Sequence, residues 1–128
     1  PVTFFVDRPP RGVRPLHVTA CTFAEFQLVL EHAYAQGWFA VVAVLHSFEF
    51  VRISALDRPG GLAGPQRVLS RRFERLCQYL ARHRDRFVTS RFADQTAIPE
   101  PAEGQSPARS TLVRTVARQA SQLLSSVL

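Results

Sequence analysis

Residues 39–45 read Phe-Ala-Val-Val-Ala-Val-Leu, an unbroken apolar run that begins two residues after Gly37 and ends at His46. Apolar side chains occupy both alternating sides of this segment, a pattern typical of a strand that is covered on both faces. Strands of this kind occur in parallel sheets flanked by helices. We therefore expect residues 39–45 to form the central strand of a parallel sheet in an α/β fold.

Helices and strands are predicted to alternate around this segment. Thr22 and Glu25 have the spacing of a capping box, and apolar residues recur at helical spacing from there until Gly37. A second helix is predicted over residues 66–83, with one apolar face. Short strands are predicted over Val2–Val6, Leu16–Ala20 and Phe87–Phe92, and a long loop over Ser54–Pro65.

The two cysteines, Cys21 and Cys77, are far apart in the sequence and have no CxxC spacing. Neither a zinc site nor a disulfide framework is indicated. Two buried thiols are expected instead, and Cys77 is assigned to the apolar face of the second helix. The other members of that face are Leu69, Phe73, Leu76 and Leu80.

Length and composition limit the possible classes of protein. A chain of 128 residues with 46% hydrophobic content can build one ordinary core. No apolar run approaches the roughly 20 residues that a transmembrane helix needs. The sequence has no methionine and starts at Pro1, so we expect it to be a processed product or the C-terminal part of a longer protein.

The basic residues are all arginine, and the formal net charge is +6. Exclusive use of arginine suggests a GC-rich bacterial source. A basic chain can bind nucleic acid, but interspersed carboxylates and aromatic residues confined mostly to apolar runs make this function unlikely. The arginines of residues 67–86 could bind an acidic polymer, although a solvated helix face is the favoured interpretation.

The chain divides into three parts: an α/β region over residues 1–94, a proline-rich linker over residues 95–109 and an amphipathic C-terminal helix over residues 110–128. The helix should cover apolar surface on its own sheet, or else on a second subunit or adjacent domain. Membrane-surface binding is a lesser alternative. The apolar stripe consists of Leu112, Val113, Val116, Ala117, Ala120, Leu123, Leu124 and Val127.

His46 is the principal candidate for chemistry because catalytic groups gather at the C-terminal ends of parallel strands. A histidine there can act as a general acid or base, and the alternative is a core histidine bonded to a loop carbonyl. Glu49 would point to the opposite face if the strand continued, so the two residues are not expected to share a metal. His17, His32 and His83 have no ligand spacing to one another.

The segments Val44–Phe50, Arg71–Cys77 and Phe87–Thr89 together resemble the C-terminal region of bacterial polysaccharide deacetylases, carbohydrate esterase family 4. The likeness covers residues 1–94. It implies the C-terminal part of a distorted β/α barrel that hydrolyses N-acetyl groups on a carbohydrate polymer or oligosaccharide. It further implies that Leu45 lines the pocket for the acetyl methyl group and that His46 is the general acid.

The family's Asp-Asp segment and HxxxH metal ligands do not occur in this sequence. The resemblance therefore implies that a divalent metal, usually zinc, is bound only by the complete protein, with ligands from a missing N-terminal segment or a second chain. The alternative hypothesis is a non-catalytic α/β module. It would act in binding or assembly through the C-terminal helix or through the arginine-rich face. The C-terminal helix could also form a homo-oligomer.

Overall fold

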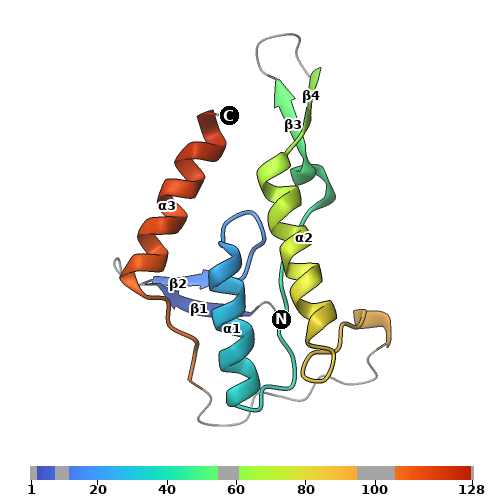
Figure 1. The fold of residues 1–128 in the computed structure, drawn as a ribbon, viewed down its shortest axis with the longest axis vertical. Coiled ribbons are helices and arrows are strands. Elements are labelled where there is room, and N and C mark those ends of the chain that lie inside the picture. Colours follow the sequence, from blue (N-terminus) through green and yellow to red (C-terminus); the bar gives the residue numbers. More distant parts are fainter. Residues whose placement is uncertain (1–2, 8–11, 55–60, 95–105, 128) are drawn as a thin grey trace.

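The computed structural model describes residues 3–7, 12–54, 61–94 and 106–127, which form a mixed α/β structure. Helix α1 lies between α2 and α3, and the β3–β4 hairpin extends beyond the start of α2 (Figure 1). In chain order the elements are β1 (Phe4–Asp7), β2 (Gly12–Pro15), α1 (Phe23–Ala35), a 3₁₀ turn (Ser47–Phe50), β3 (Val51–Ser54), β4 (Gly61–Pro65), α2 (Arg67–Arg82), a second 3₁₀ turn (Phe92–Asp94) and α3 (Leu112–Val127).

The two small sheets in the described residues are antiparallel hairpins, β1 with β2 and β3 with β4. The predicted central strand over residues 39–45 is instead an extended segment joined to the chain by a parallel bridge between His17 and Val44. The Val44 N–H donates to the Leu16 carbonyl at 2.9 Å, and the Val18 N–H donates to the Val44 carbonyl at 2.9 Å. The apolar pattern predicted a strand covered on both faces, and this is also wrong: Phe39, Ala40 and Ala43 are exposed and the other residues of the segment are half-buried.

Helix α1 begins as predicted. The Thr22 side chain accepts from the Glu25 N–H at 3.3 Å, and the Glu25 carboxylate accepts from the Thr22 N–H at 2.8 Å. This reciprocal arrangement satisfies two amide groups that the first turn of a helix leaves unpaired. After the helix, Gly37 adopts a positive φ of 62°, which a glycine accommodates without strain.

The core lies where α1 and α2 meet the β1–β2 hairpin. Cys21 is buried as predicted, but Cys77 is exposed, and Tyr79 takes a buried place on α2 instead. Phe73 is also 37% exposed. The predicted helix is therefore present, but a different face of it is buried. The buried cluster contains Phe5, Leu16, Val18, Cys21, Phe26, Val29, Leu30, Leu69, Leu76, Tyr79 and Ala108.

Four other sequence predictions are corrected. The loop expected over Ser54–Pro65 contains strand β4, paired with β3, while residues 55–60 lie outside the described part. No strand forms over Phe87–Phe92, and the second strand begins at Gly12 rather than Leu16. The last residues of the predicted linker pack against β1, because the Val6 N–H donates to the Ala108 carbonyl at 2.8 Å. Residues 95–105 of that linker are not among the described residues.

Helix α3 docks on its own chain, but through polar residues. Arg118 and Glu25 form a buried ion pair, with Nε and Oε1 3.2 Å apart and side-chain exposures of 3% and 0%. The predicted apolar stripe faces away, since Leu112, Val113 and Val116 are exposed; the side chains of Leu123, Leu124 and Val127 lie outside the description. Among the described helices, none has the length and apolar character needed to cross a membrane.

Candidate functional site

His46 is the first residue after the extended apolar segment, and its side chain is exposed. Its ring stacks on Phe48, with centroids 5.3 Å apart and planes inclined by 8°. The preceding residue, Leu45, is partly buried and packs against the hydrophobic core. The core therefore anchors the segment on one side of His46, while the imidazole remains accessible to a ligand.

Glu49 fixes the backbone of His46 from the following 3₁₀ turn. The His46 N–H donates to Glu49 Oε2 at 2.9 Å, and the Glu49 N–H donates to the His46 carbonyl at 3.1 Å. The prediction that Glu49 points to the face opposite His46 assumed that the strand continues past His46. The chain turns at Ser47, so that assumption is wrong and the carboxylate lies back against the histidine.

His17 joins this site from the neighbouring extended segment, through the parallel bridge to Val44. The His17 and His46 ring centroids are 5.7 Å apart, and His17 Nε2 lies 3.7 Å from Glu49 Oε1. The spacing of histidines along the sequence missed this residue. The usable signal was that Leu16–Ala20 and residues 39–45 were both predicted strands, whose C-terminal ends meet at one edge if they run parallel.

Thr19 lies between the imidazole of His17 and the carboxylate of Glu49. Its hydroxyl contacts His17 Nδ1 and donates to Glu49 Oε1 at 3.2 Å. A hydroxyl has one proton to donate. When it donates to Glu49, it must accept from a protonated Nδ1, which selects that form of His17. The result is a directional chain from imidazole through hydroxyl to carboxylate beside His46.

Arg72 of α2 holds the turn that carries Thr19. One of its amino nitrogens, Nη1, donates to the carbonyls of Val18 and Thr19, at 2.9 and 2.8 Å. Burial of the guanidinium lowers the Arg72 pKa from its usual value, but arginine stays charged at neutral pH. Arg72 is therefore a structural cation, whereas Arg71 and Arg75 beside it are exposed as predicted.

Cys21 is not suited to nucleophilic chemistry, because burial raises the pKa of its thiol to about 11 and the thiolate is the reactive form. Within the part of the chain that the structure describes, no group of three or more His, Cys, Asp or Glu side chains is arranged to hold a metal ion. What the site offers is proton transfer by an accessible imidazole. Comparisons with protein-family models, with curated proteins and with solved structures found no match.

Proposed function

We propose that this chain is the C-terminal part of a metal-dependent polysaccharide deacetylase, in which His46 is the general acid and Leu45 helps to line the acetyl pocket. The observation that carries the proposal is the position of His46. Its imidazole is exposed at the end of an apolar extended segment, and Glu49 fixes its backbone by a 2.9 Å hydrogen bond. A proton donor needs such a combination of access and fixed orientation.

The proposed reaction is hydrolysis of an N-acetyl group on a carbohydrate. Water adds to the acetyl carbonyl carbon and gives up one proton to solvent, and the C–N bond of the resulting tetrahedral species then breaks. Protonated His46 gives its proton to the departing nitrogen, which leaves as a free amine, and the acyl part leaves as acetic acid, which ionises to acetate. The imidazole is left neutral and, being exposed, regains a proton from solvent for the next cycle.

A divalent metal, zinc in the resembled family, would polarise the acetyl carbonyl when bound. The described residues do not form a three-ligand site, so the residues present do not fit the metal by themselves. The proposal places the ligands on a missing N-terminal segment or a second chain, which makes this chain the supplier of the proton donor.

The test is His46→Ala in the full-length natural protein, assayed by acetate release from an N-acetylated oligosaccharide. General acid catalysis contributes about 10²–10⁴-fold, so turnover should fall by that factor while bound zinc stays constant. His83→Ala is the matched control, because the His83 ring packs on Tyr79 of α2 and bonds to its carbonyl. Unchanged turnover in His46→Ala would overturn the assigned role.

The exposed stripe of α3 favours a second candidate function, a binding or assembly module. Val113 is 78% exposed, and Leu112 and Val116 are each more than half exposed. Apolar residues gathered on one surface mark interaction sites more often than scattered ones do. If Val113→Ser with Val116→Ser lowers the solution mass of the natural assembly while His46→Ala leaves deacetylation unchanged, this second function replaces the first.

A further inference from the structure

Among the described residues, the extended segment at residues 39–45 has backbone hydrogen-bond partners along one edge. The backbone groups of Val42 and Val44 are directed at that paired edge, toward Thr3, Leu16 and Val18. Successive residues of an extended chain direct their backbone groups to opposite sides. The N–H and C=O groups of residues 41, 43 and 45 therefore point to the other edge, where the described residues provide no backbone partner.

A cavity of about 500 Å³ lies beside this segment. One wall consists of Ala40–Ala43, and a second wall consists of Phe87–Arg91. The other lining residues include Leu16, together with Leu76 and Leu80 of α2 and Phe26 and Leu30 of α1. The second wall could also form backbone hydrogen bonds with an added strand. Val88 is 88% exposed, and no strand partner is present for Val88 or Thr89 among the described residues.

The size of the cavity matches a short piece of β-strand. A strand residue occupies about 160 Å³, taking a rise of about 3.3 Å, a strand spacing of about 4.8 Å and a sheet spacing of about 10 Å. A volume of about 500 Å³ then accommodates about three residues. A strand placed there would meet the outward backbone groups of residues 41 and 43 on one side and would approach Val88 and Thr89 on the other.

The lining determines the chemistry of the occupant. The charged residues among those that line the cavity are Arg86 and Arg91, which pair with Glu31 and Asp94. No carboxylate is among the described lining residues. Arg84 lines an adjoining hollow with Val88 and Thr89, and the chain carries a net charge of +6. Apolar side chains suit the lining, and acidic residues suit the surroundings.

We propose that the open edge of residues 41–45 is a docking site for an extended apolar segment of a partner polypeptide, flanked by acidic residues. Binding occurs by strand addition, in which main-chain hydrogen bonds supply affinity and alternate side chains supply specificity. The part of the segment that lines the cavity ends at Ala43, before Leu45 and His46. This interaction does not depend on the catalytic role proposed for that histidine.

The test uses the whole 128-residue chain and a capped synthetic peptide of alternating valine and threonine with two glutamates at each end. Trp38 reports on occupancy, because it is the chain's one tryptophan and lines the cavity. The peptide should shift Trp38 emission and slow amide hydrogen exchange at residues 41, 43 and 45 by about tenfold or more, as expected for newly formed backbone hydrogen bonds. The same peptide N-methylated at alternate residues should do neither.

Ala43→Pro removes one outward N–H and should weaken the peptide about fivefold or more, since one hydrogen bond is lost. Protection of the Val42 and Val44 amides in this variant shows that the paired edge persists. Absence of any Trp38 or exchange response at millimolar peptide overturns the proposal. So does protection of residues 41, 43 and 45 without peptide: concentration-independent protection means that residues 87–91 close the edge, and concentration-dependent protection means that a second copy does.

Discussion

Helices α1 and α3 lie side by side, yet they bury opposite kinds of residue (Figure 1). Helix α1 places Phe26, Val29 and Leu30 in the core. Helix α3 buries Thr115 and Arg118, while the described members of its apolar stripe face outward. The difference teaches that an amphipathic pattern shows that a helix has two faces, but the partner decides which of them is buried.

The partner that decides for α3 is a carboxylate on α1. Glu25 is fully buried and uses its two oxygens separately: Oε2 caps the helix at Thr22, and Oε1 pairs with Arg118. Leaving one buried charge without the other is costly. Turning α3 over to bury its valines would remove Arg118 from Glu25, and the capping role keeps that carboxylate where it is.

The largest expected effect comes from the apolar contact of α1. Phe26→Ala should lower the free energy of unfolding by about 4 kcal/mol, because it opens a cavity in a packed core. Urea denaturation monitored by circular dichroism measures the change. Val116→Ala on α3 is the control: its side chain is 54% exposed, and surface substitutions usually stay within about 0.5 kcal/mol. Equal effects of the two substitutions would break the contrast between the helices.

The polar contact of α3 should rank next. Arg118→Met should destabilise the protein by about 3 kcal/mol, because it leaves the Glu25 carboxylate buried without its cation. Arg114→Met, one turn earlier on the same helix and less buried, should have little effect by urea denaturation. Adding Glu25→Gln to Arg118→Met should cost less than the sum of the two single changes. An additive double variant would show that the pair is not coupled.

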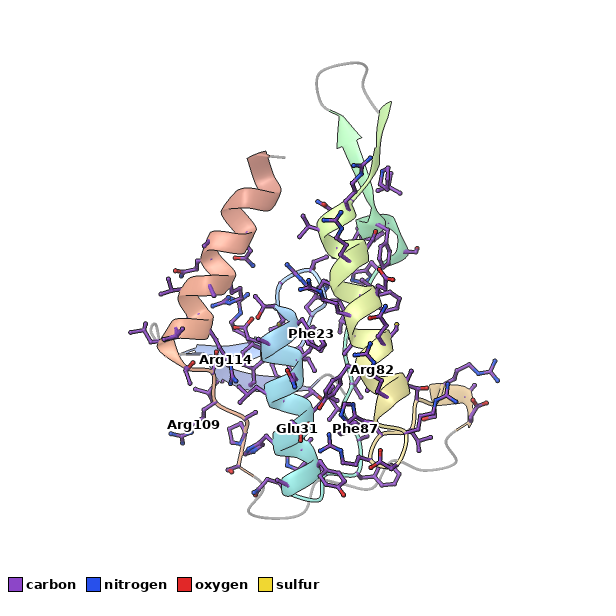
Figure 2. All side chains as sticks on the ribbon, viewed as in Figure 1. Phe23, Glu31, Arg82, Phe87, Arg109 and Arg114 are labelled. Atoms are coloured by element: carbon purple, nitrogen blue, oxygen red, sulfur yellow. The ribbon has the colours of Figure 1, made fainter. Side chains whose placement is uncertain are left out.

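The smallest expected effect concerns the exposed counterpart of that pair. Glu31 of α1 accepts from both amino groups of Arg86 at 2.8 Å and also from the Tyr79 hydroxyl, and Figure 2 shows it near Phe87. The Arg86 hydrogen bonds, and then the Tyr79 hydroxyl, lower the pKa of the Glu31 carboxyl. A lowered folded-state pKa contributes stability that is present above the ordinary glutamate value and is lost as pH falls through the folded one.

The advantage of wild type over Glu31→Gln should therefore be constant near neutral pH and shrink below about pH 4. Thermal melts at a series of pH values measure this difference. The carboxylate is 41% exposed, so solvent screening keeps the effect well below that of Arg118→Met. A difference between the two proteins that stays the same from neutral to acid pH would contradict this assignment.

The parts of the fold that depend on nearby residues could be predicted. The capping box at Thr22 and the end of α1 at Gly37 were predictable because each signal lies within a few residues of its effect. The interval of α2 was predictable from helical periodicity. Its rotation was not, because Cys77 and Tyr79 are both compatible with an apolar face, and packing against α1 selects the tyrosine.

The candidate site divides in the same way. His46 could be proposed because it directly follows an apolar segment. Glu49 was misplaced because the end of that segment is determined by the turn at Ser47–Phe50 and not by the alternation before it. His17 and Thr19 could not be found from spacing, since they reach His46 only through the bridge to Val44. Long-range pairing of this kind leaves no mark in residue spacing and could be inferred only by placing the two predicted strands side by side.

The contact between Val6 and residues 108–110 has a consequence for the order of folding. Val6 donates to the Ala108 carbonyl and accepts from the Ser110 N–H, both at 2.8 Å. During synthesis, β1 leaves the ribosome about a hundred residues before these partners do, and at about 5–20 residues per second the delay is several seconds or more. For that interval one edge of β1 is uncovered, and an exposed strand edge can pair with other chains until residues 108–110 cover it.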